Sequence, residues 1–415
     1  MDRFCCFLAA EAGAVWTGVE SNKGECERNG TMMGLLRRVA AVLGLAALCW
    51  TTGCAGFWVY PGATNGSSTT PTNDYVYVAN AYTTTTTTTM TLAGFAVGTG
   101  TLTAVPGSPY TLPFYPTAVA VNPANTIVFV AGNSEILAYA IQSDGSLSAL
   151  NSGGAVGYAA VASMDISPDG QWLFALDQNN ISLEEFQINS STGVLTQDTP
   201  ITYPVPSGAT VVAQGVKFAP NGGYLFLALG TAGDVVYPFN TSSGALYVPL
   251  SLSLGAASNN SDNALAVSPD STLLFIARSG PAGGLAVYTI GSGGSLAQVN
   301  GSPFTAGTQP YSVAVNAAGT DVYVANRGGN TISGFSIASG GSLTVLSGSP
   351  CQSGNKVTAL AVDSSGDYLL AAANGGSPDL TMYSYDSATA GKLDFATSDP
   401  TGTDPTGPVA IATTH

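Results

Sequence analysis

The chain has 415 residues and a net charge of −15, with 45 % hydrophobic residues and only 8 % charged ones. So few Lys and Arg side chains exclude nucleic acid as a partner, because binding its phosphate backbone requires a basic surface. The same composition lacks the Glu, Lys and Arg of surface helices, and its 51 glycines with many Thr, Ser and Asn predict an all-β fold of short strands and tight turns.

Residues 32–54 have the features of a bacterial export signal. Arg37 and Arg38 form a short basic region, and an apolar run of eleven residues, 39–49, follows it. That run is too short to span a bilayer comfortably and suits the core of a signal peptide. The ending Thr-Thr-Gly-Cys at residues 51–54 resembles a lipobox, although Thr stands where Leu is usual. The sequence therefore predicts lipidation of Cys54 and a lipid-anchored protein of the cell envelope outside the cytoplasm. Ordinary signal-peptidase cleavage nearby, with Cys54 unmodified, is the alternative.

Three segments surround this signal. Residues 1–31 precede it and are interpreted as a start-site artefact or a disordered stretch, because an export signal normally begins a protein. Residues 55–73 are rich in Gly, Ser, Thr and Pro and predict a flexible tether. Beyond Cys54 the chain keeps one cysteine, Cys351, so no disulfide framework is expected.

A phrase of the form Val-Ala-Val-Asn-Pro recurs through residues 74–413. Its copies, 45 to 52 residues apart at the central residue, lie at 119–123, 164–168, 216–220, 265–269, 313–317, 360–364 and 409–411. Each copy is followed by a turn, a second apolar strand, a polar loop, an alternating third strand and a Gly-x-Leu turn into an outer strand. Four short strands in a repeat of this length indicate a blade of a β-propeller.

The two ends of this region complete one another. The first copy begins at its second strand, 75–80, and lacks an inner strand, whereas 408–412 forms an inner strand with no blade after it. Joining the last strand to the first blade gives a closed seven-bladed ring without open sheet edges. An open β-solenoid, the competing interpretation, leaves both partial blades unexplained.

These residues resemble the YVTN-type propellers of the lactonase family. The most specific stretch runs through Gly-Ser-Pro-Phe at 301–304, Gln-Pro-Tyr-Ser-Val-Ala-Val at 309–315 and Val-Tyr-Val-Ala-Asn at 322–326, and the Gly-Ser-Pro element recurs at 107–109 and 348–350. The resemblance implies a seven-bladed propeller for residues 74–413. It also implies 6-phosphogluconolactonase-like activity, but many similar exported propellers have no demonstrated reaction.

Lactone hydrolysis needs a base or an activated water and donors or a cation for the oxyanion. The resemblance implies His, Arg and Glu for these roles, but the one histidine, His415, is the last residue and is interpreted as a solvated tail. Aligning the blades places Arg278 and Arg327 on one face, in adjacent blades, at the end of the second strand. These two arginines, with Asp177 as the base, are the candidate catalytic residues. Solvated loop residues are the alternative interpretation.

Four other residues are candidate ligand-binding positions. Asn80 and Asn326 occupy the equivalent end of the second strand in their own blades. Asp165 and Lys217 stand at equivalent inner-strand positions of adjacent blades, where other copies have Ala. A buried charge without a partner is costly, so the two are expected either to pair between blades or to face the channel.

Two hypotheses of function follow. In the first, the protein is a surface-exposed, lipid-anchored propeller that binds a ligand or protein without catalysis, its candidate partners being a carbohydrate, a small lactone or an envelope protein. In the second, it is a lactonase-like hydrolase that uses Arg278, Arg327 and Asp177. Neither a metal nor a cofactor is expected, since no His or Cys cluster lies in the ring. A closed ring is expected to be a monomer.

Overall fold

The computed structural model describes residues 74–83, 88–252, 259–402 and 407–415. The predicted export signal, Cys54 and the tether lie outside the described residues and stay predictions. Among the described residues, no helix is long and apolar enough to cross a membrane.

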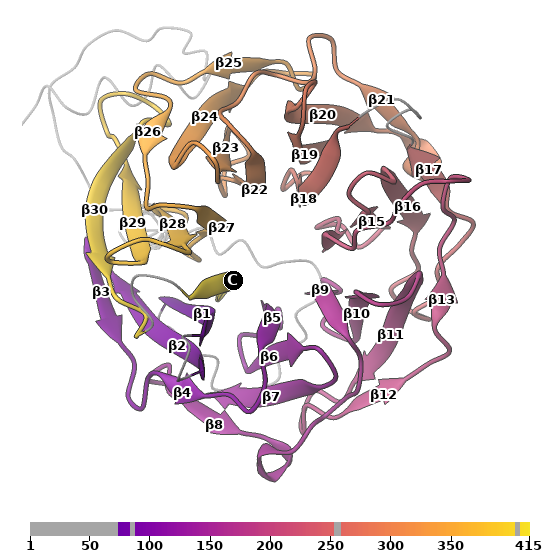
Figure 1. The fold of residues 1–415 in the computed structure, drawn as a ribbon, viewed down its shortest axis with the longest axis vertical. Coiled ribbons are helices and arrows are strands. Elements are labelled where there is room, and N and C mark those ends of the chain that lie inside the picture. The colour runs from indigo at the N-terminus through magenta and orange to yellow at the C-terminus, as the bar shows by residue number, and fades with distance from the viewer. Residues whose placement is uncertain (1–73, 84–87, 253–258, 403–406) are drawn as a thin grey trace, which may run out of the picture. The chain divides into compact units, whose positions relative to one another are not determined.

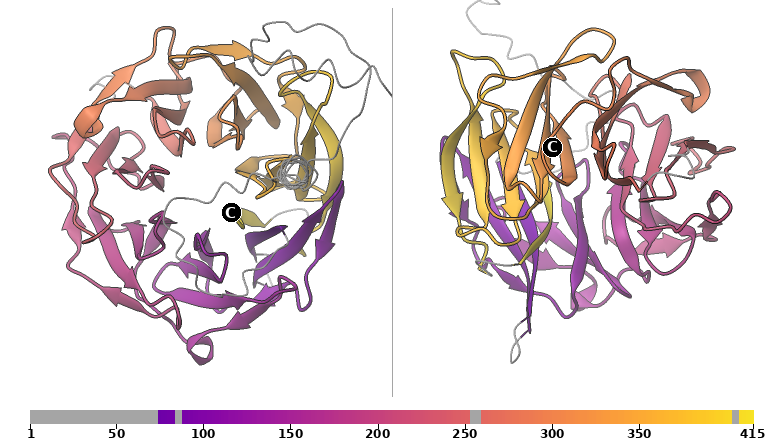
Figure 2. Two further views of the ribbon diagram at one scale, coloured as in Figure 1. Left: turned by 180° about the vertical axis from the view of Figure 1, so that it is seen from behind. Right: turned by 45° about the horizontal axis from the view of Figure 1, so that its top comes forward.

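Seven antiparallel sheets surround a common axis and form a ring (Figure 1). Each sheet has four main strands, the first nearest the axis and the fourth at the rim, and the same arrangement is seen from behind and obliquely (Figure 2). The prediction of an all-β, seven-bladed propeller is confirmed.

The blades are numbered in chain order. Blade 1 consists of β31 (Pro408–Thr413), β1 (Asp74–Thr83), β2 (Thr88–Gly98) and β3 (Thr101–Ala104). The strands of blades 2 to 4, from the axis outward, are β5 (Pro116–Val121), β6 (Ile127–Gly132), β7 (Ile136–Ile141) and β8 (Leu147–Ala149); β9 (Val161–Ile166), β10 (Trp172–Asp177), β11 (Ser182–Ile188) and β12 (Leu195–Gln197); and β14 (Gly215–Phe218), β15 (Tyr224–Ala228), β16 (Asp234–Pro238) and β17 (Leu250–Leu252).

The strands of blades 5 to 7 are β18 (Ser261–Val267), β19 (Leu273–Ser279), β20 (Gly284–Ile290) and β21 (Leu296–Gln298); β22 (Pro310–Val315), β23 (Asp321–Asn326), β24 (Thr331–Ile337) and β25 (Leu343–Val345); and β27 (Val357–Val362), β28 (Tyr368–Ala373), β29 (Leu380–Tyr385) and β30 (Leu393–Asp399). The remaining short elements are β4 (Tyr110–Thr111), β13 (Ile201–Thr202), β26 (Cys351–Gln352) and the 3₁₀ turns η1 (Asn151–Gly153) and η2 (Ser292–Gly294).

The hydrophobic core lies between neighbouring blades. Seven clusters of buried side chains form one layer at each blade interface, such as the layer in which Phe129 of blade 2 packs with Leu173 of blade 3. The second strands are buried on both faces, as all six residues of β6 are, which explains why they are continuous apolar runs.

The ring closes as the sequence predicts. The final strand β31 pairs antiparallel with β1, with Val76 opposite Thr413 and Val78 opposite Ile411. In Figure 1 the yellow end of the chain meets the indigo beginning in this sheet. Closure makes β1 an internal strand of its sheet and leaves the short β31 at the axis, like the inner strand of every other blade.

Aromatic side chains of the second strands connect successive blades. The Tyr77 hydroxyl donates to the Gly145 carbonyl oxygen (2.9 Å), the Tyr323 hydroxyl to that of Gly391 (2.7 Å) and the Trp172 indole N–H to that of Thr241 (3.0 Å). Each acceptor lies in the turn before the outer strand of the next blade. These hydrogen bonds hold neighbouring blades in register.

The recurring Gly-Ser-Pro element has one structural role in three blades. The hydroxyls of Ser108, Ser302 and Ser349 each accept a hydrogen bond from a backbone N–H of the third strand, at 2.9, 2.8 and 2.9 Å. Each serine precedes a cis proline. The Ser hydroxyl therefore accepts the hydrogen bond of a third-strand N–H at the point where the outer strand has ended and no longer supplies a carbonyl oxygen.

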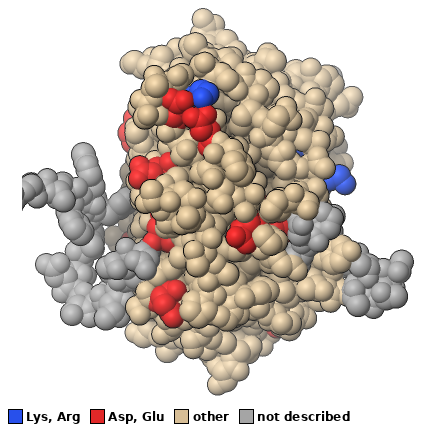
Figure 3. Space-filling view, turned by 90° about the vertical axis from the view of Figure 1, so that its left-hand side faces the viewer, with Lys and Arg blue, Asp and Glu red and all other residues tan. Residues whose placement is uncertain are grey.

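The surface is acidic, as the composition requires. The side of the molecule drawn in Figure 3 carries scattered Asp and Glu side chains and few Lys or Arg. A cluster of positive side chains would therefore stand out against the rest of this surface.

Candidate ligand site between blades 6 and 7

The loops between second and third strands share one face of the ring with the connections that lead into the inner strands. Backbone hydrogen bonds join these segments, from Arg327 N to Gln309 O (2.9 Å) in blade 6 and from Asn374 N to Lys356 O (3.0 Å) in blade 7. We call this surface the 2–3 face. It carries the ends of the second strands, where the sequence placed its candidate site.

A cavity of about 650 Å³ opens on the 2–3 face between blades 6 and 7. This size is ordinary for a small-molecule site. Its described lining consists of two cations, four side-chain amides and two glycines: Arg327, Lys356, Gln309, Asn330, Asn355, Asn374, Gly328 and Gly375. No acidic side chain is among these described residues, although the protein as a whole carries fifteen excess negative charges.

Three of the lining residues have left-handed backbone. Gln309, Asn330 and Lys356 have φ values of 55°, 55° and 53°. Such conformations are unfavourable for residues other than Gly, particularly long side chains, and persist only where neighbouring contacts impose them. Here the contact lies between blades, since the Asn330 Oδ1 accepts a hydrogen bond from the Lys356 N–H (2.8 Å). Strained backbone concentrated at one pocket is typical of a functional site.

Arg327 is positioned by an aromatic ring. Its guanidinium carbon lies 4.7 Å from the centre of the Tyr311 ring, a cation–π arrangement that leaves the N–H donors of the guanidinium available. The predicted candidate Arg327 is thus part of the cavity, with Lys356 and the amides rather than with Arg278.

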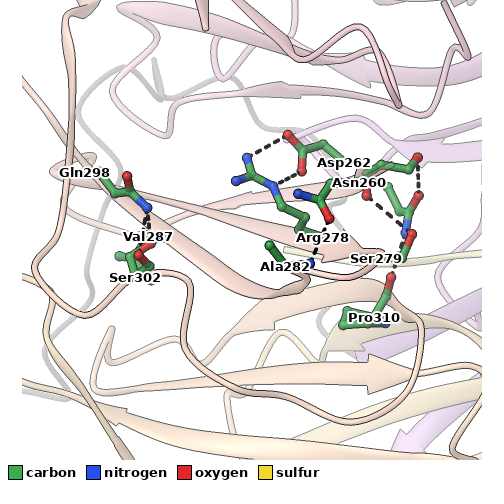
Figure 4. Close-up of polar contacts among 11 residues, drawn as sticks. Asn260, Asp262, Arg278, Ser279, Ala282, Val287, Gln298, Ser302 and Pro310 are labelled. Carbon is green, nitrogen blue, oxygen red and sulfur yellow. Dashed lines mark hydrogen bonds and ion pairs between the residues drawn. The ribbon is translucent and has the colours of Figure 1, made fainter. Parts of the chain in front are cut away.

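Arg278 lies in a different environment. It is buried, and its Nε and Nη2 atoms donate to the two carboxylate oxygens of Asp262 at 2.6 and 2.9 Å (Figure 4). Burial alone would lower the pKa of Arg278, but the hydrogen bond and charge of Asp262 raise it. The guanidinium is therefore held as half of a bidentate ion pair inside blade 5.

A second carboxyl group completes this buried cluster. Burial raises the pKa of Asp234 well above its ordinary value, the charge and hydrogen bond of Asp262 raise it further, and Arg278 offsets only part of this. Burial and the neighbouring Asp262 carboxylate therefore both favour the protonated form of Asp234. The cluster joins blades 4 and 5, because Asp234 begins β16 while Asp262 lies on β18.

Asp177 shapes its own loop. Its Oδ1 accepts hydrogen bonds from the backbone N–H groups of Asn179 and Asn180, both at 2.7 Å, and the side chain is buried. The described contacts of Asp177, Arg278 and Arg327 have no residue in common. The structure thus does not bring the three predicted catalytic residues into one network, and their catalytic role stays a prediction.

The two predicted asparagines are buried inside the loops. Asn80 accepts a hydrogen bond from the Thr401 hydroxyl (2.9 Å), and Asn326 accepts one from Gly307 N–H (2.9 Å) while donating to Ser333 Oγ (2.9 Å). Both are fully buried. Their side-chain amides hold the 2–3 face together, and a direct role in binding stays a prediction.

The inner-strand charges form the interblade pair that the sequence left open. The Lys217 Nζ lies 3.3 Å from the Asp165 Oδ1, and the lysine side chain is 47 % exposed. His415 is exposed, as expected of a solvated residue, but its backbone is held: its N–H donates to the Asn125 Oδ1 and its carbonyl oxygen accepts from the Asn125 Nδ2, both at 2.8 Å.

The cavity can bind and orient an anion, but its described lining has neither a carboxylate nor an imidazole to act as a base. Arg327 and Lys356 can neutralise negative charge, and the amides can both donate and accept hydrogen bonds. Sequence reasoning missed Lys356, because it considered only the ends of second strands, and it also missed Asn374, although this residue follows β28 as Arg327 follows β23. Aligning the residues that precede each inner strand would have placed Lys356 beside Gln309, because both precede an inner strand by one residue.

The fold and the cavity define a closed seven-bladed propeller with a cationic pocket on its 2–3 face. The family model described as Lactonase, 7-bladed beta-propeller matches residues 301–409. The predicted resemblance to the lactonase propellers is confirmed over that stretch, which contains every described lining residue of the cavity. Among curated proteins, none matches this sequence.

Solved structures extend the likeness in fold to the rest of the ring. A candidate 6-phosphogluconolactonase of Bacteroides uniformis superposes with a TM-score of 0.66 at 18 % identity, over 82 % of this chain and 99 % of that one. A Lactobacillus plantarum protein gives 0.63 at 20 % identity, over 83 % and 99 %. The periplasmic gluconolactonase of Pseudomonas aeruginosa gives 0.52 at 21 % identity, over 64 % and 79 %. At these identities the likeness concerns the fold.

Proposed function

We propose that this protein is a ligand-binding propeller that holds a small anion in the cavity between blades 6 and 7 without transforming it. The observation that supports this is the cavity's lining, in which Arg327 and Lys356 stand among side-chain amides and no described acidic residue. Only five Lys and Arg residues follow Cys54 in the sequence, so two in one pocket represent a concentration of positive charge. Such a pocket attracts anions, because its described lining has two positive side chains and no negative one to oppose them.

Titration calorimetry with the purified protein tests this proposal. We expect at least one of gluconate, citrate, acetate and inorganic phosphate to bind, and Arg327→Gln or Lys356→Gln to weaken binding about tenfold or more, since each removes a charge-assisted hydrogen bond. Lys217→Gln is the matched control, because it removes an equal charge outside the cavity. Affinity unchanged in both cavity variants would contradict the proposal.

A lactonase-like hydrolase is the second candidate. The match of residues 301–409 to the lactonase family model favours it, since that stretch contains the cavity. The cations could stabilise an oxyanion, but hydrolysis also requires a base, and none is present in the described lining. We expect no turnover of phosphorylated, sugar or aromatic lactones. Turnover that Arg327→Gln abolishes would establish the hydrolase instead.

We also propose that the propeller is attached to a membrane of the cell envelope through a lipid on Cys54. The support is the export signal at residues 32–54 and its lipobox-like ending. Detergent partitioning of the protein from labelled cells tests the anchor. Cys54→Ala should release it to the aqueous fraction, and an unchanged distribution would contradict lipidation.

A further inference from the structure

A second surface of the 2–3 face has a different chemistry from the cavity. Of the ten exposed large apolar side chains in the described part of the chain, three belong to 2–3 loops or inner-strand connections of blades 2 and 3: Tyr115 (43 % exposed), Tyr158 (69 %) and Ile181 (45 %). We call the surface formed by these residues with the amides Asn133 and Gln178 the aromatic arc.

Hydrogen bonds and close packing join the loops that carry the aromatic arc. The Gln178 Nε2 donates to the Asn133 Oδ1 at 3.0 Å, joining the loop of blade 3 to that of blade 2. Gln178 N–H also donates to the carbonyl oxygen of Ala160 (2.8 Å), two residues beyond Tyr158. On the other side, the Tyr115 carbonyl oxygen packs so closely on Gly132 that a Cβ there would lie 2.6 Å from it. The backbone therefore fixes the spacing of both tyrosines and both amides.

The polar groups of the aromatic arc are open to a partner. The Asn133 and Gln178 side chains are exposed, and the described residues leave the Asn133 Nδ2 and the Gln178 Oε1 without another hydrogen bond. The carboxyl groups next to these amides in the chain are Glu135, half-buried in the loop of Asn133, and Asp177, which is buried and bonded to its own loop. No Lys or Arg belongs to the arc. Its partner is therefore expected to carry no net charge, unlike the ligand of the cavity.

We propose that the aromatic arc binds neutral saccharide chains. A sugar ring presents a face of C–H groups that packs on an aromatic ring, and its hydroxyls both donate and accept hydrogen bonds, as a side-chain amide does. The exposed tyrosines and the exposed amides of the linked loops provide both kinds of contact. A protein partner of the usual kind would instead require a core depleted of polar groups, which a surface that includes two exposed amides does not offer.

Affinity measurements with cellohexaose, maltohexaose and chitohexaose test this inference. We expect at least one to bind with a Kd of about 1 mM, and Tyr158→Ala and Tyr115→Ala to weaken binding about tenfold, the effect of losing one stacked ring. Tyr158→Phe should retain binding, because stacking needs the ring and not the hydroxyl. Tyr247→Ala, which removes a tyrosine that is 55 % exposed on the rim of blade 4, is the matched control and should bind as the unaltered protein does.

Two results would overturn the inference. One is the absence of binding of all three hexasaccharides at about 10 mM, ten times the expected Kd. The other is equal affinity in Tyr158→Ala and the unaltered protein. Arg327→Gln should leave saccharide binding intact, so the outcome here is separate from that for the anion site.

Discussion

A buried guanidinium such as that of Arg278 is stable only while a carboxylate faces it. Replacing Arg278 with Met would leave the buried Asp262 without its cation, beside a second buried carboxyl group, Asp234. Breaking a buried pair in this way costs about 3–5 kcal/mol of folding free energy. We therefore expect Arg278→Met to lower the urea midpoint strongly, measured by the change in circular dichroism.

Arg327 provides the comparison. It lies on the cavity and contacts the Tyr311 ring, so Arg327→Met should cost about 1 kcal/mol or less. Equal destabilisation by the two substitutions would contradict the structural role assigned to Arg278.

The sequence could place these two arginines on one face but could not separate their roles. Blade alignment fixes where a second strand ends, and Arg278 and Arg327 both lie near such an end. What distinguishes them is Asp262, sixteen residues earlier, which reaches Arg278 because a bulge shifts the register of β18 against β19. A shift of this kind depends on packing in the folded sheet, and no residue pattern in the sequence indicates it.

At the scale of the element, the hydrogen bond from the third strand to the Ser hydroxyl of Gly-Ser-Pro can be tested by substitution. Removing the Ser302 hydroxyl leaves the Val287 N–H without its partner (Figure 4), so Ser302→Ala should cost about 1–3 kcal/mol in urea unfolding. Ser342→Ala, at an exposed turn of blade 6, should change stability by about 0.5 kcal/mol or less. A similar loss of stability from both substitutions would contradict the role of Ser302 as the partner of the Val287 N–H.

The strands were well predicted because the same residue pattern marks each strand and turn in every repeat. Small inner-strand residues, an apolar second strand and a Gly-x-Leu turn recur in every blade, and each agrees with the strand that the structure shows. The role of Ser in Gly-Ser-Pro was not predictable, since its partner is an N–H on another strand whose register the sequence does not state.

At the scale of the whole molecule, several buried carboxyl groups make stability depend on pH. Burial is the main cause that raises the pKa of Asp74 to about 6 and that of Glu185 to about 7, and it also raises that of Asp234. The unfolded chain releases these protons at a lower pH, near the ordinary carboxyl value. Their contribution to stability is thus complete below about pH 4 and is lost as pH rises through about 6 to 7.

We therefore expect the melting temperature to be a few degrees higher at about pH 5 than at about pH 7.5. Below about pH 4 the trend reverses, because Asp386, whose pKa is lowered by its hydrogen bond with Lys392, loses that interaction when protonated. Asp74→Asn should reduce the difference between pH 5 and 7.5 in scanning calorimetry. A melting temperature that is flat or falls on acidification to pH 5 would contradict this account.

The closure of the ring has a mechanical consequence. Asp74, at the start of β1, receives a hydrogen bond from Thr414, at the far end of β31, so the two ends of this antiparallel pair lie together. Tension between residues 74 and 415 consequently peels the pair apart one hydrogen bond at a time, from Thr413 toward Pro408, and never loads the whole ladder at once. Seven blade interfaces hold the ring together, but force applied to residues 74 and 415 separates β31 from β1 by sequential unzipping of their hydrogen bonds.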